Sequence, residues 1–327
     1  MSCAASWTPH PSHEWERPMT MPWFLRRVIE IVPTLFLTWT IVFGVLQLIP
    51  GDPVMLALGG TPASDEVIDN ERKRLGLDQP LHIQYFDFLR KMAVGDLGNS
   101  YQTKQPVGQM IAARVRPSLE LALGGLLVGI VLGVVLGLGA GLRPHGWVDT
   151  ATMSTALIGV SMPSFWIGML LIYVFGLMLE WVPILGEGID ALILPSITVG
   201  LFLAGGLARL IRSAIIETMS QDYIRTARAK GLPNFRIVAK HAMRNAIIPP
   251  ITLLGVQFAF LIGGAVVTER VFARPGLGAL LIDAVLTKDI PLVQGLVVYT
   301  TSAYILINLA LELLYGVLDP RIRSRRA

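Results

Sequence analysis

The sequence has few charged residues and almost no cysteine. Only 15% of its 327 residues are Asp, Glu, Lys or Arg, whereas 53% are hydrophobic, and the mean hydropathy is +0.60. A water-soluble domain has about 25% charged residues, because its surface faces water. Cys3 is the only cysteine, which excludes a disulfide framework, a cysteine zinc site and an iron–sulfur cluster. The shortage of charge indicates that much of the surface faces lipid.

The signatures of common enzymes are also missing. There is no G-x-x-x-x-G-K-[ST] loop to hold the phosphates of ATP, no H-E-x-x-H zinc pair and no G-x-S-x-G nucleophile turn. The five histidines are scattered along the chain. We therefore expect no catalytic, cofactor-binding or metal-binding residues, and no enzymatic activity in this chain.

Long apolar runs are what the sequence has instead. A helix needs about 20 apolar residues to cross the hydrocarbon core, and helices satisfy every backbone polar group within the segment. We predict an all-α membrane protein with six transmembrane helices. Their ranges are Val28–Ile49, Ser118–Gly141, Thr152–Met178, Ile193–Ile211, Ile247–Val267 and Leu292–Val317. Pro163 predicts a kink in the third.

The positions of Lys and Arg predict the orientation. They gather before the first run, after the second, between the fourth and fifth, and at the C-terminus, whereas the loop with Glu180, Glu187 and Asp190 has none. Cytoplasmic loops carry the excess of Lys and Arg. We therefore expect a multi-pass protein of the cell inner membrane, in contact with the lipid bilayer, with both termini cytoplasmic. The pI of about 9.3 then reflects topology, and no nucleic-acid partner is expected.

These patterns divide the chain into five predicted segments. They are a disordered cytoplasmic tail at 1–20, the first transmembrane helix at 21–49, an extracytoplasmic segment at 50–114, a core of five transmembrane helices at 115–316 with a cytoplasmic loop at 212–246, and a cytoplasmic tail at 317–327. The first 20 residues lack the basic start, apolar stretch and cleavage site of a signal peptide.

Glycine recurs at every fourth residue of the second run. The glycines are Gly125, Gly129, Gly133, Gly137 and Gly141. At helical spacing they form one smooth face that lets the backbone of another helix approach closely. We predict that this face serves helix packing; a direct part in a translocation path is the alternative.

The cytoplasmic stretch Asp222–Leu232 is the most informative in the chain. Its residues predict a short helix that ends at Gly231, which can adopt a positive φ, and a second basic helix follows as far as Asn245. A charged helix–turn–helix between two membrane helices is well placed to push on a soluble partner. It can equally be a basic anchor without a partner, and these residues alone leave both interpretations open.

Short motifs run along almost the whole chain, from Trp23 to Arg323. They are Leu48–Pro53, Leu75–Leu81, Gly95–Gly98, Ser161–Trp166, Asp222–Leu232, Arg244–Pro249, Thr268–Phe272, Pro275–Gly278 and Asp319–Arg323. In this order and spacing they resemble the binding-protein-dependent ABC importer permeases of the dipeptide, oligopeptide and nickel branch. The loop pattern of such permeases, Glu-Ala-Ala-x-x-x-Gly, is matched by Ala227 and Gly231, whereas Arg225 and Thr226 replace its Glu-Ala.

The resemblance implies a type I ABC importer permease fold and a division of labour between subunits. This chain would pair with a second homologous permease, two ABC ATPase subunits would bind ATP-Mg, and an extracytoplasmic solute-binding protein would deliver small peptides. Residues 115–316 would form the ABC permease core, and 212–246 its coupling loop. The implied ATPase-coupling residues are Tyr223, Arg225, Thr226, Ala227, Arg228, Ala229, Lys230, Gly231 and Leu232.

Several alternatives stay open at this point. Within the same branch, the solute can be nickel, glutathione or another peptide-like compound instead of a di- or oligopeptide. Outside it, the chain can be a stand-alone secondary transporter or channel, or a membrane scaffold without transport.

Overall fold

The chain is predominantly helical. The computed structural model describes residues 23–48, 52–58, 63–186, 188–263 and 265–318, and the only pairing of extended backbone among them is an isolated bridge between Asn99 and Pro106. The predicted all-α class is confirmed. The tails predicted at 1–20 and 317–327 lie outside the described residues, apart from Val317 and Leu318 at the end of the last helix.

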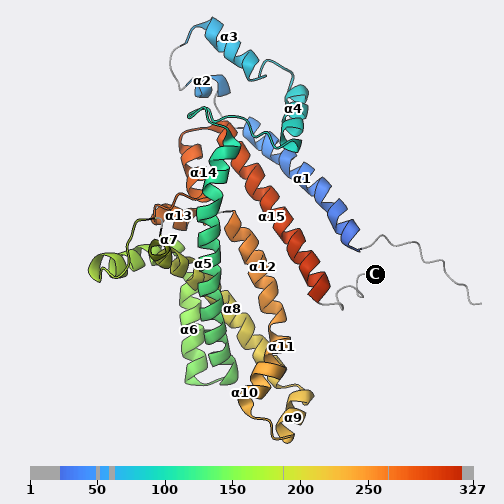
Figure 1. Cartoon of the computed structure of the whole chain (residues 1–327), viewed down its shortest axis with the longest axis vertical. Coiled ribbons are helices and arrows are strands. Elements are labelled where there is room, and N and C mark those ends of the chain that lie inside the picture. Colours follow the sequence, from blue (N-terminus) through green and yellow to red (C-terminus); the bar gives the residue numbers. More distant parts are fainter. Residues whose placement is uncertain (1–22, 49–51, 59–62, 187, 264, 319–327) are drawn as a thin grey trace, which may run out of the picture.

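Fifteen α-helices and two π-helical segments are described, and Figure 1 shows their arrangement. In chain order they are α1 (Trp23–Gln47), α2 (Pro53–Ala57), α3 (Asp65–Arg74), α4 (Leu81–Ala93), α5 (Val107–Leu142), α6 (Trp147–Ser161), α7 (Ser164–Leu171), η1 (Ile172–Met178), α8 (Ile189–Met219), α9 (Asp222–Ala229), α10 (Asn234–Arg236), η2 (Ile237–Ala242), α11 (Met243–Ala246), α12 (Ile248–Ile262), α13 (Val266–Val271), α14 (Leu277–Leu286) and α15 (Ile290–Leu318).

Among the described residues, three helices are long and apolar enough to cross a membrane: α5, α8 and α15. A fourth crossing results if α6 is counted together with α7 and η1, and α1 and α12 have shorter apolar parts. The predicted six crossings are therefore not established by length and composition. The run Ile247–Val267 shows the reason, because its helix ends at Ile262 while the apolar sequence continues past that end.

The third predicted crossing is broken instead of kinked. Helix α6 ends at Ser161, α7 begins at Ser164, and the two directions differ by 103°. Proline lacks an N–H group and disfavours helical dihedrals in the residue before it, and Met162 indeed has the extended values φ −80° and ψ 136°. In Figure 1, α7 leaves the side of the bundle instead of continuing along it.

A cap of three short helices, α2, α3 and α4, lies at the end of the molecule opposite α9 (Figure 1). The Asp52 carboxylate accepts a hydrogen bond from the Val54 N–H at the start of α2 and pairs with Arg72 of α3 at 2.6 Å. Phe43 of α1 stacks against Tyr85 and Phe88 of α4, which fastens the cap to the first long helix.

A buried carboxylate joins the loop between α4 and α5 to the last helix. Asp289, just before α15, accepts hydrogen bonds from the Ser100 hydroxyl and from the Tyr101 N–H at 3.0 Å. Burial, together with the nearby charge of Asp289, raises the pKa of the Tyr101 phenol to about 12. The predicted boundary at residue 114 falls inside α5, because this helix begins at Val107 and continues outward beyond its apolar run.

Candidate functional site

Helix α9 ends in a glycine turn. Gly231 has a φ of +74°, which a residue without a Cβ atom adopts at little cost. The Leu232 N–H donates to the Ala227 carbonyl at 3.3 Å, and the Gly231 N–H donates to the Arg228 carbonyl at 2.9 Å. This pair of bonds is the Schellman arrangement, and it turns the chain sharply back towards the membrane helices.

One face of α9 is buried against the rest of the loop. Ile224 and Ala227 pack with Ile237 of η2, and Met219 of α8 and Leu232 complete this apolar cluster. Ile224 and Ile237 are both fully buried. Helix α9 is therefore packed against the end of α8 and against the helix by which the chain returns, made of η2, α11 and α12 and called the returning helix below. A force on α9 acts on both.

The opposite face of α9 is open to solvent. Of the predicted coupling residues, Ala227 is buried and Leu232 is half-buried; the exposed ones are Tyr223, Arg225, Thr226, Arg228, Ala229, Lys230 and Gly231. The ion pair of Arg225 with Asp222 spans 3.4 Å between exposed side chains, and such pairs contribute little stability. The face is basic and available for a partner.

Phe235 adds an aromatic side chain that the sequence reasoning missed. It lies in the short helix α10, just after Pro233, and 84% of its surface is exposed, while Tyr223 is 41% exposed. Exposed aromatic residues with basic neighbours are enriched where proteins bind one another. The sequence contained one signal for it: Phe235 is a large apolar residue in a segment that is too charged to enter lipid.

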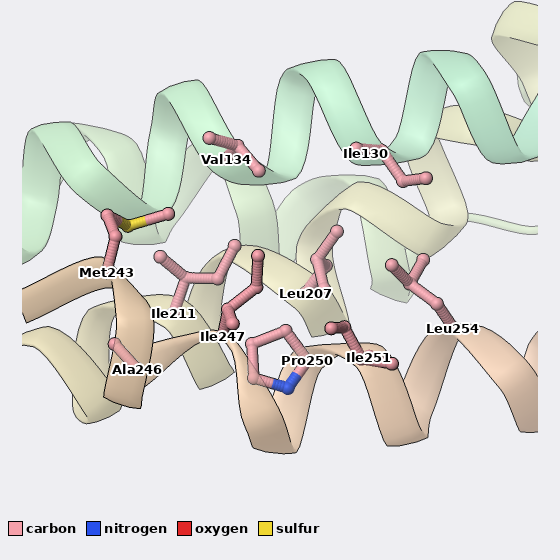
Figure 2. Close-up of a pocket in the computed structure, with 10 residues that line it drawn as sticks. All are labelled: Ile130, Val134, Leu207, Ile211, Met243, Ala246, Ile247, Pro250, Ile251 and Leu254. Atoms are coloured by element: carbon pink, nitrogen blue, oxygen red, sulfur yellow. The ribbon is translucent and has the colours of Figure 1, made fainter. Parts of the chain in front are cut away.

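The returning helix meets α5 and α8 around a small apolar cavity of about 70 Å³ (Figure 2). Apolar side chains from three segments of the chain line it. The residues are Ile130 and Val134 of α5, Leu207 and Ile211 of α8, and Met243, Ala246, Ile247, Pro250, Ile251 and Leu254 of the returning chain. The packing between the loop that carries α9 and the long helices α5 and α8 therefore leaves a small void.

The five predicted glycines lie in the contact between α5 and α8. All five are buried, and a Cβ atom built on any of them meets a branched side chain of α8. The nearest atoms would be 2.6 Å away at Val199 for Gly125, 2.8 Å at Leu203 for Gly129, 2.8 Å at Leu207 for Gly133, 2.7 Å at Ile211 for Gly137 and 3.0 Å at Ile215 for Gly141. Real Cβ atoms essentially never lie within 3.0 Å of another atom, so α8 would have to shift to make room for a side chain at these positions.

The glycine face and α9 are connected through α8. The contact partners Val199 to Ile215 run in the same direction along α8 as the glycines do along α5, so the two helices are parallel. Helix α8 continues to Met219, which packs against α9. The structure therefore joins both sets of predicted residues to one long helix.

An ion pair fixes α6 to the C-terminal part of α8, near α9. Asp149 accepts two hydrogen bonds from the Arg212 guanidinium, each 2.6 Å long, and a third from the His145 N–H at 2.9 Å. The Asp149 side chain is only 6% exposed. No sequence pattern indicated this pair, because its members are 63 residues apart in the chain.

A second buried carboxylate lies at the opposite end of the bundle. Glu269 accepts hydrogen bonds from the Ser118 hydroxyl at 2.6 Å and from the N–H groups of Gly278 and Ala279 at 2.8 and 3.0 Å. Glu269 therefore caps the start of α14, where the first backbone N–H groups have no partner within the helix. A Cβ atom on Gly276 would lie 2.2 Å from the Glu269 carboxyl carbon, so this position requires glycine.

Two families of sequence match the chain. Residues 129–324 match the family described as "Binding-protein-dependent transport system inner membrane component". Residues 20–122 match the one described as "Binding-prot-dependent transport system membrane comp, N-term". Together these matches extend over most of the chain.

Curated relatives are similar over nearly their whole length. The "Glutathione transport system permease protein GsiC" of Salmonella choleraesuis (strain SC-B67) is 40% identical over 302 residues, which cover 92% of this chain and 98% of the relative. The protein of the same name from Escherichia coli (strain K12) gives the same values.

One solved structure supports the fold. A chain from "Inward facing conformations of the MetNI methionine ABC transporter: CY5 native crystal form" is 18% identical, with a TM-score of 0.50, over 64% of this chain and 97% of that one.

Proposed function

The chain belongs to the family of binding-protein-dependent transport system inner membrane components and is a permease subunit of an ABC importer, and from this premise we propose that it imports short peptides or peptide-like solutes such as glutathione. It is a multi-pass protein of the inner membrane. The similarity to glutathione permeases over 92% of the chain is the observation that carries the proposed class of solute.

We propose six crossings with both termini cytoplasmic. Helices α1 and α12, which are short of a full span in their described apolar parts, both pack against α15. The basic segments before α1, between α8 and α12 and after α15 then share one side of the membrane, as the excess of Lys and Arg in cytoplasmic loops requires.

The exposed face of α9 is the proposed seat of an ATPase subunit. Two such subunits would bind ATP-Mg, and their closure would move α9. Because α9 is packed on Met219 and Ile237, the motion would pass to α8 and to the returning helix, and through the glycine contact to α5. Such a rigid-body movement is the usual basis of switching between two conformations.

Two further partners complete the proposed complex. A second, homologous permease would enclose the translocation path together with this chain. A solute-binding protein would dock on the extracytoplasmic end, formed by the cap of α2–α4 and by residues 285–288, which are exposed. Asp289 fastens the loop between α4 and α5 to the start of α15, which supports a rigid outer surface for docking.

Reconstitution into vesicles tests this proposal. The chain is inserted alone, or with its permease partner and two ATPases, and uptake of glutathione and of dialanine is measured with the binding protein outside and ATP inside. We expect uptake only by the complete assembly and only with ATP. Uptake by the chain alone would instead identify a channel or a secondary transporter.

A further inference from the structure

A large cavity opens where the third predicted crossing breaks. It measures about 500 Å³ and is bounded by the break Ser161–Ser164, by Phe202 of α8, by Gln257 and Phe260 of α12 and by Ala265–Thr268. Sites for small molecules typically enclose about 300–1,000 Å³. The cavity therefore has the size of a ligand site. It does not include the exposed face of α9, whereas Val199 and Leu203 of α8 both line it and meet the glycine face of α5.

The cavity lies at the depth of the membrane centre. The atom nearest to a Cβ built on Gly159 is the Leu201 carbonyl oxygen, and Val160 lies against Gly205. Residues 201 to 205 are in the middle of the apolar run Ile193–Ile211. Helix α6 therefore ends about halfway across the membrane. Gln257 is likewise well inside α12.

Interrupted backbone at this depth needs an aqueous or protein neighbour. Within lipid, backbone outside regular helices is tolerated only where protein buries it or where it lines a water-filled cavity. Ser161 and Pro163, on either side of the break, are exposed in this chain. The break therefore faces an aqueous path or a partner rather than hydrocarbon.

The lining is apolar apart from a few neutral polar groups. Ser161 and Ser164 contribute hydroxyls and Gln257 an amide, and no Asp, Glu, Lys or Arg lines the cavity. The described residues offer no hydrogen-bond partner to these three side chains. An apolar pocket with a few convergent polar groups is the usual form of a small-molecule site.

We propose that this cavity is the solute-contacting half of the translocation path, and that Gln257 with Ser161 binds the amide groups of a passing peptide. The proposal rests on the proposed function and adds a place and a chemistry to it. A glutamine side chain both donates and accepts hydrogen bonds, which matches a peptide amide. The charged ends of the solute meet no oppositely charged side chain in the cavity. The cavity therefore recognises the amide backbone of the solute and does not select by its charge.

Thiol accessibility tests whether the cavity is an aqueous path. Cys3 is the only cysteine, so Cys3→Ser provides a background for Ser161→Cys and Gln257→Cys in the complete transporter. Leu127→Cys is the matched control, because Leu127 is exposed at the same depth, opposite the glycine face of α5. A charged methanethiosulfonate should modify both cavity variants at least about 10-fold faster than the control. Equal rates at all three positions would overturn the proposal.

Uptake tests whether the solute contacts Gln257. Gln257→Leu keeps the size of the side chain and removes its hydrogen bonds, whereas Gln257→Asn keeps the amide. For dialanine and glutathione we expect about 10-fold slower uptake with leucine, which corresponds to ~1.4 kcal/mol, and partial recovery with asparagine. Wild-type uptake rates in Gln257→Leu would overturn the contact.

Failure of the proposed function and failure of the present inference give different experimental results. A wild-type transporter that imports neither probe contradicts the proposed function, and the thiol rates then still decide whether the cavity is aqueous. Normal wild-type import together with an unreactive cavity contradicts the present inference alone.

Discussion

At the scale of single residues, glycines meet two different physical needs in this chain. Gly231 is needed for its backbone conformation, because its φ is +74° while no atom lies within 4 Å of a Cβ built there. Gly133 is needed for its lack of volume, because its φ is helical and Leu207 fills the space. The same residue type therefore responds to substitution in two distinguishable ways.

Substitutions of Gly231 should follow backbone preference rather than size. Gly231→Asn keeps the turn, since asparagine tolerates this conformation, whereas Gly231→Ala costs about 1–2 kcal/mol. Gly231→Pro cannot adopt the φ and also removes the hydrogen bond to Arg228. We expect near-normal uptake with asparagine and uptake lost, with ATP hydrolysis uncoupled from it, with proline. Normal coupling in Gly231→Pro would contradict the role of the turn.

Substitution of Gly133 should follow volume. Gly133→Ala places a Cβ atom 2.8 Å from Leu207, and overpacking of this kind typically costs about 1–3 kcal/mol. Gly139→Ala on the same helix is the control, because no atom lies within 4 Å of its Cβ position. The Tm of the purified protein in detergent should fall for Gly133→Ala and not for Gly139→Ala. Equal Tm values would show that α5 and α8 can separate without cost.

At the scale of elements, apolar runs predicted which segments are helical but not where each points. The run Thr152–Met178 marked a crossing and Pro163 an interruption, yet the 103° change of direction depends on how α7 packs against α13, which no local pattern reports. The glycine turn of α9 was predictable because its chemistry is local. The partners of Asp149 and Glu269 were not, since they come from distant segments.

The basic face of α9 predicts an electrostatic effect on coupling. Arg228→Glu with Lys230→Glu reverses the charge of the exposed face and leaves Ile224 and Ala227 in place. We expect membrane insertion to be unchanged, and ATP-driven uptake to be lost through weakened ATPase docking. Arg143→Glu, exposed in the turn after α5, is the control for added negative charge. Coupling that survives the double reversal would exclude this face as the seat of the ATPase.

At the scale of the whole molecule, one long helix connects the two ends of the proposed function. Helix α8 carries α9 at its C-terminal end, the glycine contact with α5 along its length and Phe202 of the large cavity near its middle. Asp149 and Arg212 add α6 to the same body. In the proposed function, a displacement of α9 would be conveyed to the cavity by these packed side chains.

Cross-linking from α9 tests this account most directly. In the Cys3→Ser background of the complete transporter, Arg228→Cys is treated with a short bis-maleimide, and Trp147→Cys, exposed at the cytoplasmic start of α6, serves for comparison. The account predicts a cross-link from Arg228→Cys to an ATPase subunit whose yield changes when ATP is bound, and little from Trp147→Cys. ATP-driven uptake with no cross-link from α9 would contradict it.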